Sequence, residues 1–155
     1  MNSLWMYFDN NCKKVRSTEF QNAKTRGIIG IKLNDGDKLI SAIPTTGSSD
    51  VMLISRRGKA LRITENSVRT MGRASCGIKG MKLSEGDEIA AAVKVEDDAN
   101  IILITEKGYG KRISFEWYSV HGRGTGGQRI FGGTDDRGEI IGIQKMSCLF
   151  MEVHG

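Results

Sequence analysis

The sequence predicts an all-β protein made of about three copies of one propeller-like unit. The chain repeats itself at a spacing of about 50 residues, and each repeat contains several short apolar runs separated by glycine turns. No long stretch has the 3.6-residue apolar period of an amphipathic helix. We therefore expect a single domain over residues 1–155, with repeats at about 4–50, 51–100 and 101–150.

The repeat is clearest between the second and third copies. The sequence "LISRRG" beginning at Leu53 aligns with "LITEKG" beginning at Leu103, at an offset of 50. The first copy follows at an offset of 46 in its opening strands, which places Arg16 on Arg62, and at 50 from Gly27 onward. We interpret the change of offset as a difference in loop length.

Each copy is read as four short strands in order. The runs "VMLIS" and "IILIT" predict an opening strand, and the turns "RRGK" and "EKGYG" lead into the strands "ALRIT" and "KRISF". The segments "GIKGMKL" and "IAAAVKV" supply the third and fourth strands of the second copy, after no more than a short turn over residues 67–73. Four strands in about 50 residues, repeated, are typical of the four-stranded antiparallel blades of propellers.

Three units predict open ends. Closed propellers usually need at least about four blades, so unpaired strand edges are expected at both ends of the array, and such edges invite association. Either two chains complete a ring, or the chain is an excerpt of a longer array. The run "CLFMEV" at residues 148–153 resembles an opening strand and favours the excerpt.

Charge is segregated within each copy of this basic chain, whose net charge is +5. Between residues 55 and 82 there are eight basic residues and one acid, whereas residues 83–98 hold six acids and one lysine. In a radial array equivalent positions share one radius, so the basic segments would join into a stripe around the outer edge. Such a stripe suits a bent DNA duplex held by phosphate neutralisation with little base reading. The alternative is ordinary solvated surface charge.

Other site chemistries find little support. Cys12, Cys76 and Cys148 are widely spaced and odd in number, which predicts reduced thiols rather than disulfides or zinc. His121 and His154 lack ligand spacing, and "GRGTGGQR" lacks the lysine of a phosphate loop. We expect no catalytic residue, metal or cofactor, no membrane segment, and a cytoplasmic location. Aromatic and methionine residues are interpreted as packing groups; they are Trp5, Tyr109, Trp117, Tyr118, Met6, Met52 and Met81. The alternative for the four aromatic residues is stacking on nucleic-acid bases.

The segments "GYGKRISFEWYSVHGRGTGG" and "RGIIGIKLNDGDKLISAI" resemble the repeats of the C-terminal domain of DNA gyrase A, and the related topoisomerase IV domain has similar blades. The resemblance spans nearly the whole chain. It implies a six-bladed β-pinwheel, of which this chain would hold part, that wraps duplex DNA to support ATP-dependent negative supercoiling. It also implies partners in the rest of the gyrase A protein and in the gyrase B protein, with ATP, Mg²⁺ and the catalytic tyrosine located elsewhere in the parent topoisomerase.

One departure from the family pattern concerns its seven-residue box, Gln-Arg-Arg-Gly-Gly-Lys-Gly. The equivalent segments are "QNAKTRG", "MGRASCG" and "HGRGTGG", and only the last keeps both the middle arginine, Arg123, and the following glycine, Gly124. We expect the box-bearing blade to be absent. The alternative is a relative without the box, of the topoisomerase IV type, with weak wrapping.

The resemblance assigns DNA-phosphate contacts by position. The candidate residues are Lys59, Arg62, Arg73, Lys111, Arg112 and Arg123, followed by Lys14, Arg16, Lys24 and Arg26 from the first copy. Arg62 and Arg112 have an alternative role as strand residues paired with nearby acids. A further alternative for the whole chain is a protein-interaction propeller whose basic edge is incidental.

Overall fold

The computed structural model describes residues 3–8, 10–131 and 137–147. These residues form strands and three short 3-10 helices, with no α-helix in that part of the chain, which confirms the all-β prediction. The strands are β1 (Ser3–Phe8), β2 (Asn11–Arg16), β3 (Leu39–Thr45), β4 (Asp50–Ser55), β5 (Lys59–Thr64), β6 (Ile78–Lys79), β7 (Ile89–Lys94), β8 (Ala99–Thr105), β9 (Gly110–Ser114), β10 (Gln128–Arg129) and β11 (Ile140–Ser147). The 3-10 helices are η1 (Ser17–Phe20), η2 (Glu65–Ser67) and η3 (Phe115–Trp117).

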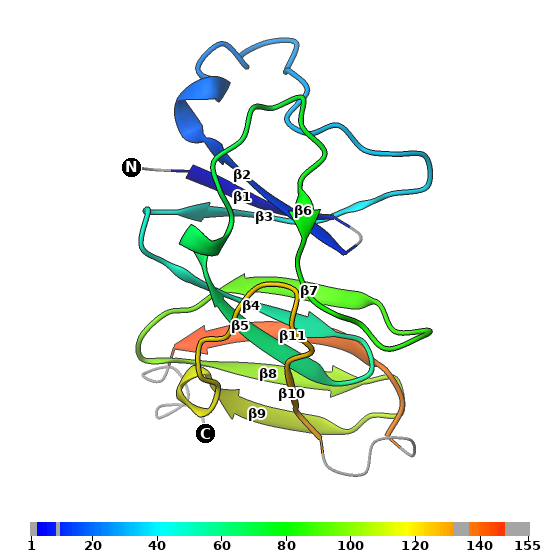
Figure 1. Cartoon of the computed structure of the whole chain (residues 1–155). Helices are drawn as coiled ribbons and strands as arrows, with labels where there is room; N and C mark the ends of the chain where they lie inside the picture. The colour runs from blue at the N-terminus through cyan, green and yellow to red at the C-terminus, as the bar shows by residue number, and fades with distance from the viewer. Residues whose placement is uncertain (1–2, 9, 132–136, 148–155) are drawn as a thin grey trace.

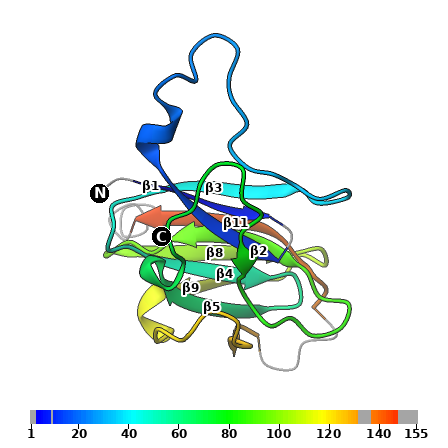
Figure 2. The ribbon, with the colours of Figure 1, turned by 45° about the horizontal axis from the view of Figure 1, so that its top comes forward.

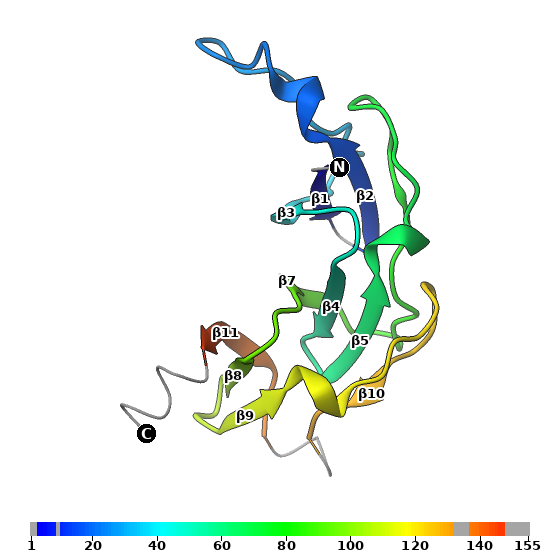
Figure 3. The ribbon, with the colours of Figure 1, turned by 90° about the vertical axis from the view of Figure 1, so that its left-hand side faces the viewer.

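The strands form three antiparallel sheets in the orders β3-β1-β2-β6, β10-β5-β4-β7 and β11-β8-β9. The sheets follow one another along an arc (Figure 3). β3, β7 and β11 lie on its concave side, and β2, β5 and β9 lie on its convex side (Figure 3). Each sheet is therefore one propeller-like blade.

The fourth strand of a blade comes from the next copy. β6 of the second copy pairs with β2, with Lys79 opposite Asn11, and β10 of the third copy pairs with β5, with Arg129 opposite Lys59. The sequence suggested that the four strands of one copy form one blade, and this is wrong. A loop of ten residues separates η2 from β6, and it is long enough to reach the preceding sheet (Figure 1).

The core fills the two spaces between successive sheets. Trp5, Tyr7 and Leu53 belong to one buried cluster, and Met52 and Leu103 belong to the other. Because β4 lies between both clusters, its residues 51–55 are buried on both faces, which explains the unbroken apolar run "VMLIS". Burying each large apolar side chain stabilises the array by about 1.5–3 kcal/mol.

The predicted packing residues divide into two groups. Met6, Met52 and Met81 are buried, as are Trp5 and Tyr118, which confirms their prediction as core residues. Trp117 is 61% exposed and Tyr109 is 50% exposed, so their prediction as packing residues is wrong. Both belong to the third copy, whose sheet has a neighbour on one side only among the described residues.

Among the described residues, neither end of the array has the neighbouring strand that the internal blades have. In the first copy, residues 27–33 correspond to the segment that forms β6 in the second, but no described strand pairs with them. At the other end, β9 is the outer strand of a sheet that has three strands in the described part of the chain. The run "CLFMEV" lies outside the described residues.

Candidate nucleic-acid interface

Two loops cross the convex side of the array, and we call residues 68–82 and 118–131 the outer loops (Figures 2 and 3). Each is attached to the sheet of the preceding copy at equivalent backbone points. Met71 N–H donates to the Lys14 carbonyl at 2.8 Å, and His121 N–H donates to the Arg62 carbonyl at 2.9 Å. The loops also bind each other, since Gly124 N–H donates to the Gly80 carbonyl at 2.7 Å.

Two glycines in the outer loops are required by packing. A Cβ on Gly80 would lie 2.8 Å from the Tyr7 ring, and one on Gly127, at φ +75°, would lie 2.6 Å from the Ala60 carbonyl oxygen. By contrast, a Cβ on Gly72 or Gly122 would meet nothing within 4 Å. The loop therefore has open space beside it at Gly72 and Gly122, whereas at Gly80 and Gly127 it packs closely against the preceding sheet.

The outer loops carry six basic side chains. They are Arg69, Arg73, Lys79, Lys82, Arg123 and Arg129, and we call them the loop cations. All are exposed except Arg73, which is half-buried. The ion pairs of the described residues join Arg56 to Glu88 and Glu139, Arg62 to Asp50, and Lys145 to Glu96, so none uses a loop cation.

Two loop cations also link successive copies. Arg73 Nη1 donates to the Ile29 carbonyl at 2.8 Å, and Arg123 Nη1 donates to the Lys79 carbonyl at 2.7 Å. Both the donors and the acceptors are separated by 50 residues, so the two contacts are equivalent. Each arginine thus places its charge beside the glycine segment of the copy before it.

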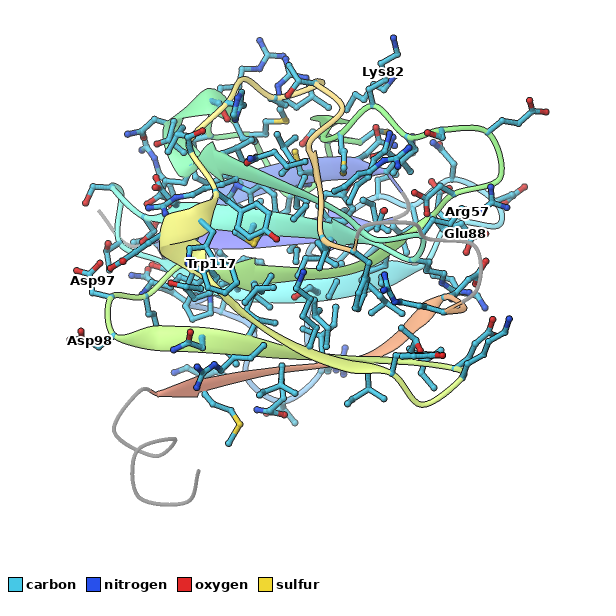
Figure 4. All side chains as sticks on the ribbon, turned by 90° about the horizontal axis from the view of Figure 1, so that it is seen from below. Arg57, Lys82, Glu88, Asp97, Asp98 and Trp117 are labelled. Atoms are coloured by element: carbon cyan, nitrogen blue, oxygen red, sulfur yellow. The ribbon has the colours of Figure 1, made fainter. Side chains whose placement is uncertain are left out.

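The acidic turn beside the basic segment has a structural role. Asp87 Oδ1 accepts hydrogen bonds from Arg57 N–H at 3.0 Å and Glu88 N–H at 2.8 Å, which fixes the turn against the β4–β5 hairpin. Figure 4 shows Arg57 and Glu88 at one end of the sheets, Asp97 and Asp98 at the opposite end, and Lys82 apart from both. The acids therefore lie at the strand ends, and the loop cations lie on the segments that cross the strands.

Two residues that were predicted as DNA contacts make contacts within the fold. Lys14 is 7% exposed, and its Nζ lies 3.4 Å from the Glu65 carbonyl. Arg62 forms an ion pair with Asp50 at 2.9 Å and donates to the Phe115 carbonyl at 3.0 Å. Each cation thus reaches the first residue of the 3-10 helix of the next copy. The burial of Lys14 contradicts a surface contact there, and the pairing of Arg62 fits its alternative role.

These contacts also correct the alignment of the first copy. Lys14 and Arg62 hold equivalent positions, 48 residues apart, whereas the sequence comparison had placed Arg16 on Arg62. The β1–β2 hairpin pairs Phe8 with Asn11, while the β4–β5 hairpin pairs Ile54 with Ala60, so the first turn is shorter. The correct register therefore places one gap in the turn, in addition to the gap between β2 and Gly27.

The remaining residues that were predicted as DNA contacts are either half-buried or exposed. Lys111 is half-buried, with its Nζ 2.5 Å from the Ile130 carbonyl and 5.6 Å from the Phe131 ring centre. Lys59 is half-buried, and its Nζ donates to the Ser84 hydroxyl at 3.2 Å. The exposed residues are Arg16, Lys24, Arg26 and Arg112.

Lys13, which sequence reasoning did not select, anchors the first outer loop. It is fully buried, and its Nζ donates to the Arg73 carbonyl at 2.6 Å and the Ser75 carbonyl at 2.9 Å. Burial lowers the pKa of the Lys13 ammonium below its ordinary value, while the charge of Glu19 acts in the opposite direction. Beside it, burial raises the pKa of the Cys12 thiol to about 12. No signal in the strand itself identifies Lys13, because its burial comes from the outer loop of the next copy.

Four of the loop cations were also outside the set selected from the sequence. Arg69, Lys79, Lys82 and Arg129 were not selected because the family motif was applied to the strands and the box-like loops alone. The part of the chain that the structure describes holds no cluster of three histidine, cysteine or acidic side chains suited to a metal. None of its helices is long and apolar enough to cross a bilayer.

Sheets that exchange a strand with the next repeat, arranged along an arc, define a propeller-like blade array. A family model described as "DNA gyrase C-terminal domain, beta-propeller" matches residues 9–46, 49–96 and 99–145. Because these matches cover most of the chain, the chain belongs to the DNA gyrase C-terminal domain family.

Curated relatives agree over shorter stretches. The DNA gyrase A protein of Treponema pallidum is 56% identical over 63 residues, which are 41% of this chain and 8% of the relative. The DNA gyrase A protein of Escherichia coli is 50% identical over 60 residues, or 39% of this chain and 7% of the relative. The matched part is therefore a small fraction of these relatives' length.

Solved structures show the same fold over nearly the whole chain. The structure of a DNA gyrase A C-terminal domain superposes with a TM-score of 0.80 at 28% identity, covering 94% of this chain and 49% of that one. The crystal structure of a C-terminal domain of DNA topoisomerase IV gives a TM-score of 0.77 at 19% identity, covering 99% of this chain and 67% of that one. The second likeness concerns the fold alone.

Proposed function

We propose that the chain binds duplex DNA along its convex side and bends it, as a non-catalytic part of a type IIA topoisomerase. The observation that supports this most directly is the repeated attachment of the outer loops. Six cations lie on these two loops and form no ion pair in the described part of the chain, which supports a basic surface on the convex side. Family membership supports the same function. In the parent enzyme, the curved duplex would serve ATP-dependent negative supercoiling together with the rest of the gyrase A protein and the gyrase B protein.

The proposed contacts are electrostatic. Each loop cation that neutralises a phosphate releases a counterion, so six contacts predict an affinity loss of roughly 10³-fold between about 50 and 200 mM salt. Exposed Arg16, Lys24, Arg26 and Arg112 extend the proposed set, as does Lys59 at its edge. Lys14, Arg62 and Lys111 are assigned to the fold, because they lie on the strands, are buried or half-buried, and bind carboxylate or carbonyl oxygens there. Arg73 and Arg123 also donate to carbonyls, but they lie on the outer loops and stay in the proposed set.

The test compares two charge-reversal variants by fluorescence anisotropy with labelled duplex. Arg69→Glu combined with Arg129→Glu changes two exposed loop cations that form no ion pair with another described residue. We expect at least tenfold weaker binding to every sequence and a shallower salt dependence. The matched control is Lys38→Glu combined with Lys107→Glu, which changes net charge equally at exposed positions outside the outer loops. Equal losses in both variants would refute the interface.

A series of duplex lengths tests bending. Affinity that continues to rise beyond a short footprint supports wrapping, because added phosphate contacts must offset a bending cost of several kcal/mol. Binding that saturates on a short duplex fits weak wrapping of the topoisomerase IV type. No salt-sensitive duplex binding at all would favour a protein-interaction propeller.

A further inference from the structure

The two open ends of the array are the two halves of one interface that the chain already makes twice. The donor half is the glycine segment that β6 and β10 supply to the preceding sheet, and the acceptor half is the outer strand β2 or β5. Residues 27–33 are a donor half, and β9 is an acceptor half, with no described partner for either. We propose that a second copy of this chain joins the two, head to tail, by strand exchange.

The donor segment has the residues and exposure that strand addition requires. Ile28 is 36% exposed, Ile29 is 73% exposed and Leu33 is 38% exposed. β-branched residues in an unpaired, exposed segment are the features through which sheet edges associate. The segment is also held in place, since the Ile29 carbonyl accepts the same arginine contact that the Lys79 carbonyl accepts beside β2.

The register of the new pair follows from the two internal examples. In the second blade, Gln128 pairs with Ala60 and Arg129 pairs with Lys59. At an offset of 50 from β5, the acceptor positions are Gly110 and Tyr109, and the donor positions in the first copy are Ile28 and Ile29. Ile29 of one chain would therefore lie opposite Tyr109 of the other, which covers two exposed apolar side chains.

Arg112 completes the acceptor. Lys14 and Arg62 each donate to the carbonyl at the start of the next copy's 3-10 helix, and Arg112 holds the equivalent place on β9. Unlike those two residues, it is exposed, and it lacks the ion pair that Arg62 makes with Asp50. In the proposed pair it would reach the start of η1 of the second chain.

Exposed apolar side chains in the third copy support the same partner, a second copy of this chain. Ile104, Trp117 and Val120 are 41%, 61% and 49% exposed. The equivalent residues of the second copy are Ile54, which is fully buried between two sheets, Ser67, which is half-buried, and Thr70, which is exposed. The comparison between Ile104 and Ile54 therefore supports the missing neighbour most directly. A contact of this kind is heterologous, because different surfaces of the two chains meet, so it forms a ring where the rotation closes and an open row otherwise.

The experiment measures association of the 155-residue chain by sedimentation equilibrium, without DNA and at high salt. We expect concentration-dependent association that high salt does not abolish, because the contact is backbone pairing and apolar burial. A monomer at every concentration up to about 100 µM, a range that spans weak specific interfaces, would overturn the proposal. This readout is independent of the proposed DNA binding.

Two variants each remove one half of the interface. Ile29→Asp blocks the donor and Arg112→Glu blocks the acceptor, and each is expected to weaken self-association at least tenfold. Both positions are exposed, so the fold should be retained, which the unfolding midpoint verifies. Ile141→Asp is the matched control, because Ile141 is 70% exposed but lies on β11, away from the β9 edge.

Mixing the two blocked variants gives the sharpest outcome. Each retains one intact half, so the mixture should form a one-to-one complex while either variant alone stays monomeric. Failure of the mixture to associate, association of Ile29→Asp at the wild-type level, or an equal loss in Ile141→Asp would each refute the head-to-tail contact.

Discussion

The segments 27–33 and 77–83 are near-copies in sequence but not in structure. "GIIGIKL" has no described strand beside it, and Ile29 is 73% exposed. "GIKGMKL" lies on β2, forms β6 and buries Met81 completely. The difference shows that this segment becomes a strand because a preceding sheet receives it, since β-propensity acts mainly through packing against neighbouring strands.

The largest expected effect concerns glycines that hold the same place in two copies. Gly27 and Gly127 both have positive φ, but a Cβ on Gly27 meets nothing, whereas one on Gly127 lies 2.6 Å from the Ala60 carbonyl oxygen. Gly127→Ala should lower the free energy of unfolding by about 3 kcal/mol or more, from backbone strain and a clash that the sheet cannot relieve. Gly27→Ala should cost about 1 kcal/mol, from backbone strain alone.

Urea denaturation at a concentration where the chain is monomeric measures both variants. Equal losses of unfolding free energy in Gly27→Ala and Gly127→Ala would show that the preceding sheet contributes nothing to the requirement for glycine. The proposed difference between the segment packed on a sheet and the unpaired segment would then be refuted.

The second prediction concerns the lysine beneath the covered loop. Lys13→Met keeps the length of the side chain but leaves the Arg73 and Ser75 carbonyls without their donor, at an expected cost of about 1–3 kcal/mol. Lys32→Met in the uncovered segment changes an exposed side chain and should stay within about 0.5 kcal/mol. A hydrogen-exchange comparison should also show faster exchange over residues 71–77 in Lys13→Met. Unchanged exchange there would refute the anchoring role.

The third prediction uses the pH dependence of stability. Because the folded-state pKa of Cys12 is raised from 9.0 to about 12, the folded state keeps a proton that the unfolded chain releases. Stability should therefore be intact below pH 9.0 and fall as pH rises from there towards 12, at a limiting slope of about 1.4 kcal/mol per pH unit.

Cys12→Ala should flatten this slope, because it removes the buried thiol. Cys76→Ala is the matched control, since the Cys76 side chain is exposed on the outer loop that covers β2. Urea midpoints at several pH values test the pair, and a slope that survives in Cys12→Ala would assign the alkaline loss to another group.

The fold class could be predicted well from the sequence, because the patterns that indicate strands and turns lie within short segments of the chain. Apolar runs such as "VMLIS" and glycine turns repeat along the chain, and the positions of β4, β5, β8 and β9 follow from them. The partner of each glycine segment could not be predicted in the same way. Pairing between Ile78 and Cys12 joins residues 66 positions apart, and no local pattern distinguishes a sheet in the same copy from one in the preceding copy.

The burial of the basic residues was predicted less well for a related reason. Lys13 and Lys14 read as surface charges, yet the next copy's outer loop and 3-10 helix cover them and supply carbonyl acceptors. Arg69 and Lys82 lie on the covering loop and are exposed. Whether a basic strand residue is buried here depends on the loop or 3-10 helix of the next copy that covers it. That contact is a property of the assembled array rather than of the strand.

The smallest expected effect compares a covered cation with its uncovered equivalent. Arg62→Gln removes a partly buried ion pair with Asp50 and the contact with the Phe115 carbonyl, so we expect it to destabilise by about 1 kcal/mol. Arg112→Gln on β9 changes an exposed side chain and should be silent, within about 0.5 kcal/mol, at a concentration where the chain is monomeric. At concentrations where chains associate, Arg112→Gln should acquire a cost, because the second chain would then cover it as η3 covers Arg62. A cost at Arg112 that does not change with protein concentration would mean that β9 stabilises the chain by itself, and the equivalence of the two positions would be lost.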